Sequence, residues 1–398
     1  MTVTTSSAID HAATRSALSG LAPLVAIIAL NFSAIGAPLP AIALYVHNEL
    51  GFDAFTVGWV IGLQSIVTVL TRHWAGTIAD HRGPRAGVLV GVPLTAIAGI
   101  FYLASAWTAG TAPQRLALLL VARVLLGFGE SLFLTGTMSW GIGRIGPART
   151  GRVMAWQGIA MYAAFGLGAP LGLSIYRAYG FAGIGALTTV LPLIALVIAG
   201  LLPAVPATGG DRAPFHKVIS LIWRPGLILM LATIPFAAMA AFLPLDYAAR
   251  GWDHAGLAIT AFGIAYTLVR LVGAHWPDSF GAVRVVGVSL AIETAGQLLL
   301  WLAPTPSLAI TGAALSGFGF SLVFPSMGVI ATKQVPASQR GRAVGNFVAF
   351  FDIAAGLTGP IVGLLTGAFG YDVAFLIGAV ATASAGLLLP AVGRLKAE

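Results

Sequence analysis

The chain has 398 residues, of which 58% are hydrophobic and only 9% are charged, and its formal net charge is +8. A soluble globular domain carries about 25% charged residues, so this composition excludes an ordinary soluble enzyme or binding domain. The sequence has no cysteine, which excludes disulfides, thiolate catalysis and cysteine-ligated metals. The apolar runs reach about 20 residues without the alternation of barrel strands, and they predict an all-α membrane protein.

Twelve apolar runs follow one another along the chain, and each is long enough to cross a bilayer as a helix. The first extends from about Leu18 to Val46, which is too long for a signal-peptide core, so we expect a retained first span. The expected helices cover residues 19–46, 54–79, 86–109, 113–142, 153–176, 181–202, 225–247, 255–277, 285–304, 307–332, 342–368 and 371–391.

One long polar stretch, from Pro203 to Arg224, separates the sixth helix from the seventh. We therefore expect a six-helix bundle in residues 1–202, a cytoplasmic linker in residues 203–224 and a second six-helix bundle in residues 225–398.

Lysine and arginine gather in alternate loops, whereas the opposite loops hold few bases and several carboxylates. This asymmetry predicts that both termini are cytoplasmic. It also assigns the net positive charge to membrane orientation, so no nucleic-acid partner is expected.

The chain nearly repeats itself after 190 residues. The segment from Gly127 to Leu132 recurs from Gly317 to Leu322, and Pro170 recurs as Pro360 without a gap. A fixed register across two expected helices and their loop indicates that one six-helix unit was used twice. Many transporters built in this way place a substrate site between two moving halves.

The loop after the second helix carries a charged motif that reads Gly-Thr-Ile-Ala-Asp-His-Arg-Gly-Pro-Arg. It resembles the signature Gly-x-x-x-Asp-Arg-x-Gly-Arg-Arg of the major facilitator superfamily, with His81 and Pro84 at positions that are usually basic. The resemblance implies two pseudo-symmetric six-helix bundles and a loop that latches the cytoplasmic side closed. The implied gate residues are Gly76, Asp80, Arg82, Gly83 and Arg85.

A weaker copy of this motif follows the eighth helix. Arg72 and Arg270 each stand eight residues before the aspartate of their copy, which is Asp80 or Asp278. The second half of the chain therefore repeats the first at this position too.

The fourth helix contains Arg-x-x-x-Gly-x-Gly from Arg123 to Gly129, which resembles a superfamily motif associated with antiporters. Arg123 lies about 15 Å into its span at 1.5 Å per residue. A charge there costs at least about 2.5–3.5 kcal/mol, so it should face a cavity or a partner. Glu130 lies on the same helix face, and the repeat places Ala313 and Phe320 opposite these two charges.

The fifth and eleventh helices contain Gly168-Ala169-Pro170 and Gly359-Pro360. Both resemble the Gly-Pro motif of the superfamily's exporters and antiporters. Small residues let helices from opposite halves touch, and a proline can bend a span. We expect hinge or packing roles for Gly168, Pro170, Gly359 and Pro360, and plain helix packing is the alternative.

Carboxylates within spans are the candidates for proton coupling, because a carboxyl group in a low-dielectric site can exchange a proton near neutral pH. Asp352, whose repeat partner is Tyr162, and Glu130 are the favoured groups, and Arg123 and Glu293 complete the candidate set. For Glu293, a structural hydrogen-bonded acid is the competing interpretation.

Polar side chains in the middle of spans usually face protein rather than lipid. The expected substrate-cavity residues are Asn31, Gln64, Gln157, Tyr162, Tyr266 and Asn346, with interhelical hydrogen bonding as the alternative for each. The sequence has no phosphate loop, metal-ligand cluster or nucleophile triad, so we expect no cofactor, no metal and no enzyme activity.

Over its whole length the sequence resembles the major facilitator superfamily, and its fourth, fifth, tenth and eleventh helices resemble the YhhS/YfcJ-type branch of arabinose-efflux-like permeases. The segment from Gly317 to Pro325, and Asp352 ahead of Gly359-Pro360, carry that narrower resemblance.

The resemblance implies a monomeric secondary transporter of the bacterial inner membrane, which exports a small organic molecule such as a sugar, drug or metabolite by proton antiport and alternating access. The expected partners are a small-molecule substrate, protons and the lipid bilayer. One alternative is a proton symporter or uniporter that imports a sugar or small organic acid. Another is a non-transporting membrane receptor or assembly partner.

Overall fold

The computed structural model describes residues 3–146, 149–207, 215–335 and 340–393, and these ranges are helical with short connections and contain no strand. The α-helices are α1 (Val3–Gly36), α2 (Pro38–Leu44), α3 (Ala54–His81), α4 (Pro84–Trp107), α5 (Ala112–Ile145), α6 (Thr150–Leu201), α7 (Phe215–Ala249), α8 (Ala255–Gly273), α9 (Ala282–Trp301), α10 (Pro306–Phe320), α11 (Val323–Lys333), α12 (Arg340–Phe369) and α13 (Val373–Gly393). The expected all-α fold is confirmed.

In the described ranges, 11 helical segments are long and apolar enough to cross a membrane. One of them, α6, has 52 residues and turns at Gly180, where φ is 62° and ψ is −164°. The two parts of α6 correspond to the fifth and sixth expected helices. The turn within α6 therefore accounts for the difference from the twelve helices that the sequence predicts.

Replacing Gly180 by alanine should destabilise this turn, because its backbone conformation is open essentially only to glycine. Such strain costs about 1–3 kcal/mol. We expect Gly180→Ala to lower the melting temperature of the purified protein. Gly200→Ala is the matched control, since it lies in the same helix and a Cβ there meets no atom within 4 Å. Equal melting temperatures for the two variants would contradict this reading of the turn.

Several spans are interrupted rather than continuous. The first span consists of the inner part of α1, α2 and a π-helical turn at Tyr45–Glu49, and Pro38 occupies the first turn of α2. The tenth span breaks between α10 and α11, at Ser321 and Leu322. These interruptions do not follow from hydrophobic pattern, which is unbroken across them.

The start of α3 shows how local sequence sets a helix boundary. Asp53 is the N-cap, and its carboxylate accepts a hydrogen bond of 2.9 Å from the Thr56 backbone N–H. The Thr56 hydroxyl and the same N–H hold the pKa of Asp53 below its usual range. The expected second helix therefore begins where its sequence predicts.

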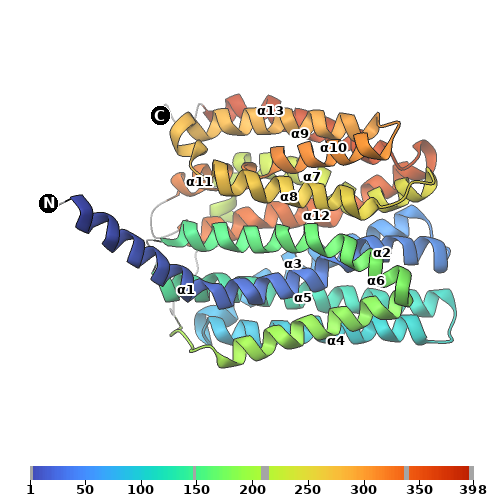
Figure 1. Ribbon diagram of the computed structural model, residues 1–398, viewed down its shortest axis with the longest axis horizontal. Coiled ribbons are helices and arrows are strands. Elements are labelled where there is room, and N and C mark those ends of the chain that lie inside the picture. The colour runs from blue at the N-terminus through green and yellow to red at the C-terminus, as the bar shows by residue number, and fades with distance from the viewer. Residues whose placement is uncertain (1–2, 147–148, 208–214, 336–339, 394–398) are drawn as a thin grey trace.

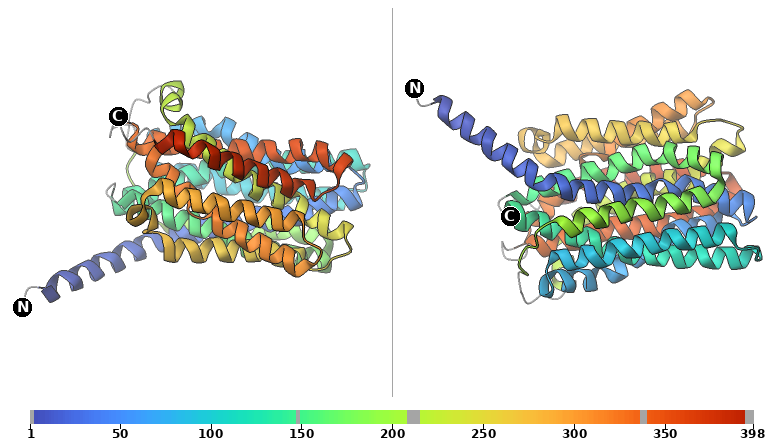
Figure 2. Two further views of the ribbon diagram at one scale, coloured as in Figure 1. Left: turned by 90° about the horizontal axis from the view of Figure 1, so that it is seen from above. Right: turned by 60° about the horizontal axis from the view of Figure 1, so that its bottom comes forward.

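The helices form two groups, with α1–α6 in one part of the molecule and α7–α13 in the other (Figure 1). Both termini lie at one end of the bundle, and the first part of α1 projects beyond it (Figures 1 and 2). Large apolar side chains such as Leu70, Val197 and Leu387 are 68%, 64% and 83% exposed, which suits a surface that faces lipid. The expected boundaries at residues 202/203 and 224/225 stay predictions, and residues 208–214 of the expected linker lie outside the described ranges.

The two groups meet mainly along two helix pairs, α3 with α12 and α6 with α8, and the short helix α2 also contacts α7. A Cβ on Gly58 of α3 would overlap the backbone of Gly359 and Pro360 in α12. In the other pair, a Cβ on Gly256 of α8 would lie 2.9 Å from Cα of Pro170 in α6. Since Gly256 stands 198 residues after Gly58 and Pro360 stands 190 after Pro170, the sequence repeat extends to these tertiary contacts.

Candidate functional site

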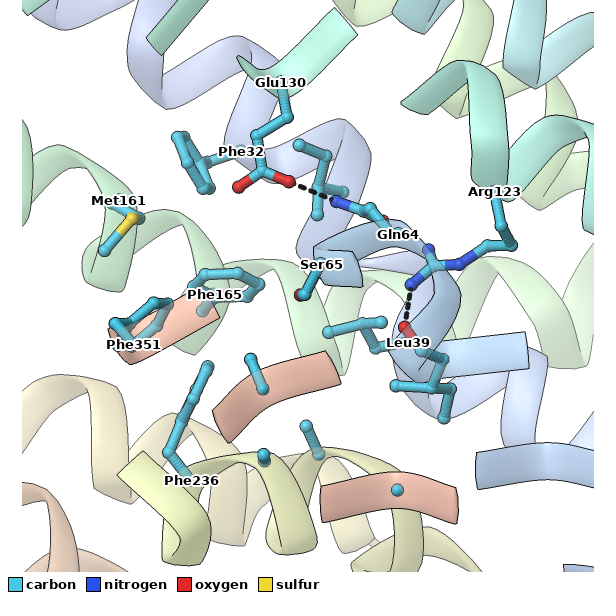
Figure 3. Close-up of a pocket in the computed structure, with 16 residues that line it drawn as sticks. Phe32, Leu39, Gln64, Ser65, Arg123, Glu130, Met161, Phe165, Phe236 and Phe351 are labelled. Carbon is cyan, nitrogen blue, oxygen red and sulfur yellow. Dashed lines mark hydrogen bonds between the residues drawn. The ribbon is translucent and has the colours of Figure 1, made fainter. Parts of the chain in front are cut away.

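A cavity of about 60 Å³ lies between the two groups of helices (Figure 3). Its wall combines aromatic and aliphatic side chains with a few polar groups, among them Gln64, Arg123 and Glu130. The first group of helices contributes Phe32, Ile35, Leu39, Ile61, Gln64, Ser65, Arg123, Glu130, Met161 and Phe165, and the second group contributes Phe236, Ala237, Ala240, Phe351, Ala355 and Gly359. An apolar pocket with a small number of oriented polar groups is the usual form of a small-molecule site.

Glu130 of α5 points toward Gln64 of α3 at one side of this cavity (Figure 3). Its carboxylate accepts hydrogen bonds from the Gln64 amide at 2.7 Å and from the Thr68 hydroxyl at 3.3 Å. All three residues belong to the first group of helices and are buried. The carboxylate is therefore positioned by neutral donors and can change its protonation state without breaking an ion pair.

Arg123 of α5 is fully buried and its guanidinium is bound to α3. Its Nε donates to the Val60 carbonyl at 2.8 Å, its Nη2 donates to the Ile61 carbonyl at 2.7 Å, and its Nη1 donates to the Tyr102 hydroxyl at 3.3 Å. Arg123 and Glu130 form no ion pair with each other among the described residues. The expected partner of this membrane-embedded charge is thus the backbone of a neighbouring helix.

Substituting Arg123 should lower the stability of the folded protein more than it changes how a transported ligand fits the cavity. Each hydrogen bond from a charged donor contributes about 1.5–3 kcal/mol, and a lysine lacks the planar fork of donors with which the guanidinium binds the Val60 and Ile61 carbonyls. We expect Arg123→Lys to lower the melting temperature of the purified protein. Arg152→Lys, at an exposed position near the start of α6, serves as the control. An unchanged melting temperature for Arg123→Lys would show that these bonds do not stabilise the fold.

Asp352 of α12 forms a buried ion pair with Arg72 of α3, so this pair joins the two groups of helices. The Arg72 side chain is 18% exposed and that of Asp352 is 5% exposed. Asp352 does not line the cavity, but its neighbour Phe351 does. The sequence singled out Asp352 but missed Arg72 as its partner. The repeat of Arg72 as Arg270 was the one available signal.

Aromatic rings fill the second contact between the groups. Tyr162 of α6 stacks on Tyr266 of α8, with ring centroids 3.9 Å apart and an interplanar angle of 29°. Phe320 and Phe236 also contact Tyr162, at 5.8 and 5.5 Å between centroids. Phe236 lines the cavity, whereas Tyr162 and Tyr266 do not. These two expected cavity residues therefore stand behind its aromatic wall.

The remaining expected cavity residues lie away from the cavity. Asn31 is buried in α1 and donates to the Ile27 carbonyl at 2.8 Å. Gln157 of α6 donates to the Leu134 carbonyl at 3.2 Å, which links two helices of the first group. Asn346 is half-buried on α12. For Asn31 and Gln157 the geometry agrees with the alternative of hydrogen bonding between or within helices.

Glu293 of α9 is fully buried, and neither of its carboxylate oxygens has a hydrogen-bond partner among the described residues. A Cβ on Gly319 of α10 would lie 2.7 Å from the Glu293 Cβ, so the two helices pack closely here. The competing interpretation, a hydrogen-bonded structural acid, has no support in this geometry.

The five residues of the expected gate motif lie at the α3–α4 connection, at the end that holds the termini. Gly76 is buried in α3 and Asp80 stands in its last turn, while Arg82 is exposed. Gly83 has a φ of 86°, which suits glycine, and Pro84 begins α4. Arg85 donates to the Gly200 carbonyl at 2.7 Å, near the C-terminal end of α6. Pro84 thus has a local structural role where the motif usually has a base.

Two contacts at the opposite end of the bundle were not found from the sequence. The Tyr371 hydroxyl lies 3.1 Å from His47 Nε2, and an Arg177 guanidinium nitrogen lies 3.9 Å from Asp253 Oδ1. Each contact joins the first group of helices to the second. Burial raises the pKa of Tyr371. Isolated polar residues that are separated by up to 324 positions carry no sequence signal of such pairing.

Comparison with known proteins places this geometry in a family. A family model described as the Major Facilitator Superfamily matches residues 24–254 and 247–396. An uncharacterized MFS-type transporter of Burkholderia pseudomallei is 41% identical over 381 residues, which cover 95% of this chain and 93% of that protein. One of Salmonella typhimurium is 42% identical over 350 residues, with 88% and 90% covered.

Solved structures share the fold at low sequence identity. The nucleoside transporter NupG superposes with a TM-score of 0.75 at 16% identity, over 94% of this chain and 99% of that one. A D-xylose-proton symporter superposes with a TM-score of 0.74 at 15% identity, over 93% and 96%. With a matching family model along nearly its whole length and relatives above 40% identity, the chain belongs to the major facilitator superfamily and is a multi-pass membrane transporter.

Proposed function

We propose that the protein is a proton-coupled antiporter of the bacterial inner membrane that exports a small organic molecule. The observation that carries the proposal is the ion pair between Arg72 and Asp352, which joins the two groups of helices beside the cavity. Family membership supports secondary transport, and the ion pair supports coupling of that transport to protons.

The chemistry of the pair links a proton to a movement between the halves. While Asp352 is ionised, its attraction to Arg72 holds α12 against α3 in a low-dielectric setting. When Asp352 gains a proton, this attraction is lost and Arg72 becomes an unpaired, partly buried charge, which favours separation of the helices there. Protonation therefore biases the equilibrium between two arrangements of the halves, which is what coupling requires.

The contact between α3 and α12 is long enough to control both ends of the cavity. It extends from Ala54, whose carbonyl lies against Gly363, to Arg72 and Asp352. At 1.5 Å per residue, this is about 27 Å along α3. The glycines allow α3 and α12 to pack closely at one end of this contact, and the ion pair is a charge-dependent contact toward the other end. Alternating access follows if the two ends open in turn.

Export and orientation rest on further features of the chain. Gly359 and Pro360, which resemble the exporters' Gly-Pro motif, lie in the contact between α12 and α3. The alternate-loop arrangement of bases supports cytoplasmic termini. The bacterial relatives support the inner membrane, and the YhhS/YfcJ-type branch remains part of the proposal.

Transport in inside-out membrane vesicles tests the proposal directly. An imposed pH gradient, acid inside, should drive uptake of the substrate into the vesicles, and addition of substrate should release protons from them. Candidate sugars, organic acids and amphipathic cations are screened against vesicles without the protein. Uptake that is unaffected by any proton gradient would indicate a uniporter, and uptake driven by the reverse gradient would indicate a symporter. Either result overturns antiport.

A non-transporting receptor would give a different result in the same vesicles. It would bind a ligand without moving it, so no screened compound would accumulate and none would shift the internal pH. Saturable binding with no flux in either direction would therefore favour the receptor or assembly-partner alternative.

A further inference from the structure

Arg270 of α8 is a buried arginine at the contact between the two groups of helices. Only 5% of the residue is exposed. Its Nη1 donates to the Ser321 carbonyl at 3.0 Å and its Nη2 donates to the Tyr266 hydroxyl at 2.9 Å, while its enclosed Nε has no partner in the part of the chain that the structure describes. A guanidinium has five N–H donors, so most of this donor capacity is unused.

No ion pair with Arg270 occurs among the residues that the structure describes. Buried charges in proteins are normally paired or bound to a metal. The charge of Arg270 instead lies over the ring of Tyr266, with Cζ 5.3 Å from the ring centroid. A cation–π contact and one carbonyl dipole neutralise it only in part.

Comparison of the two repeats shows how the surroundings of Arg270 differ from those of Arg72. Arg72 stands 198 residues before Arg270 and pairs with Asp352 across the first helix contact. The residue 190 positions before Asp352 is Tyr162, which stacks on Tyr266 in the second contact. One arginine of the pseudo-symmetric pair therefore has a carboxylate partner, and the other faces phenol rings.

The carbonyl that binds Arg270 is available because the tenth span is broken. Ser321 lies between α10 and α11, and its hydroxyl donates to the Tyr266 carbonyl at 2.7 Å, which holds the break against α8. Its repeat partner, Ser131, lies within the uninterrupted helix α5. The break and the unneutralised arginine thus occur together in one half only.

From this asymmetry we infer that the transported molecule is an organic carboxylate and that Arg270 receives its anionic group, an inference that rests on the proposed transport function. The ligand's carboxylate pairs with Arg270 as the carboxylate of Asp352 pairs with Arg72. A guanidinium binds a carboxylate through two parallel N–H···O bonds, and the unpartnered donors of Arg270 match this need.

The side chains around Arg270 also indicate the chemistry of the rest of the transported molecule. Tyr162, Tyr266, Phe320 and Phe236 form a continuous set of ring contacts from Arg270 to the cavity wall. Aromatic rings of this kind pack against an aromatic or aliphatic body. The ligand class is therefore a small monocarboxylate with an apolar or aromatic body.

The guanidinium lies where a movement of the halves would reach it. A Cβ added to Gly158 of α6 would stand 2.8 Å from Arg270 Nη2, so the backbone of the opposite half directly covers the charge. Separation of α6 from α8 uncovers Arg270 and parts the Tyr162–Tyr266 stack at the same time. The anion site is thus closed in this arrangement and opens with the halves.

Ligand-dependent thermal stability of the purified, detergent-solubilised protein tests the inference. The probes are acetate, benzoate and phenylacetate, with benzamide as the neutral isostere of benzoate. We expect benzoate or phenylacetate to raise the melting temperature of the wild type, and benzamide not to do so. Arg270→Gln should abolish the difference, whereas Arg270→Lys should retain part of it because the charge is kept.

Two further variants make the result specific. Arg177→Gln removes an exposed arginine, with a side chain 58% exposed, and should respond to benzoate as the wild type does. Gly158→Ala keeps Arg270 but crowds its Nη2 in this closed arrangement, so it should favour the open arrangement and strengthen the benzoate effect, a result that does not depend on whether Arg270→Gln folds. A wild type that none of the three carboxylates stabilises, or an Arg270→Gln variant that responds like the wild type, overturns the inference.

These measurements are independent of proton coupling, because detergent solution has no gradient. If benzoate acts through Arg270 while vesicles show no proton-driven flux, anion binding stands and the antiport proposal fails. If flux is proton-driven but the Arg270 variants transport and bind normally, the anion inference alone fails.

Discussion

Asp352→Asn should abolish proton-driven transport while leaving exchange of substrate for substrate intact. An amide keeps the size of the side chain but cannot gain or lose the proton, and it no longer attracts the Arg72 guanidinium. Breaking a buried ion pair costs about 3–5 kcal/mol, and the 18% exposure of Arg72 places this case at the low end. Because each 1.4 kcal/mol is a factor of ten, a cost of about 3 kcal/mol corresponds to a fall in gradient-driven uptake of about a hundredfold.

The measurement compares uptake in vesicles with and without an imposed pH gradient, alongside counterflow at equal pH. Asp246→Asn is a matched control, since Asp246 of α7 is buried and its partner Arg250, at 3.0 Å, directly follows that helix, so the pair does not join the halves. It should retain coupling. The exchanged pair Arg72→Asp with Asp352→Arg restores the attraction and should recover part of the gradient-driven uptake.

Glu130 is the alternative to Asp352 as the group that couples transport to protons. Its carboxylate has neutral hydrogen-bond donors and lines the cavity, so it can titrate without opening the contact between the halves. If Asp352→Asn keeps full gradient-driven transport and Glu130→Gln loses it, the coupling group is Glu130. If both variants keep it, the assignment of coupling to these carboxylates is wrong.

Gly359→Ala should shift the protein toward the arrangement that is open at the end opposite the termini. A Cβ on Gly359 would overlap the Gly58 carbonyl, where α12 and α3 lie in backbone contact. Overpacking of this kind costs about 1–3 kcal/mol, which raises the ratio of open to closed molecules about five- to 150-fold. Transport should slow because one half of the cycle becomes unfavourable.

The absence of cysteine from the sequence makes this shift measurable without background. A single cysteine is introduced at Ser65, which lines the cavity, and a membrane-impermeant thiol reagent is added from the side opposite the termini. Labelling should rise in Gly359→Ala. Gly367→Ala is the control on the same helix, because a Cβ there meets no atom within 4 Å. Equal labelling of the two variants would show that the Gly58–Gly359 contact does not close this end.

Features that depend on local composition and register follow from the amino-acid sequence alone. Apolar runs longer than a bilayer is thick predict the spans wherever they lie in the chain, and the small residues around Pro170 and Pro360 predict close packing of helices from opposite halves. The sequence also identifies Arg123, Glu130 and Asp352 as candidate functional residues, because a charged side chain inside a membrane span is energetically costly.

The groups that these residues contact are apparent only in the folded molecule. Arg72 and Asp352 are 280 positions apart, and His47 and Tyr371 are 324 apart, so their pairing depends on how two bundles pack. The break at Ser321 is equally hidden, because apolar residues flank it without interruption. Hydrophobic burial is non-directional and sets which segments enter the membrane, whereas hydrogen bonds and ion pairs require particular distances and angles that exist only in the folded bundle.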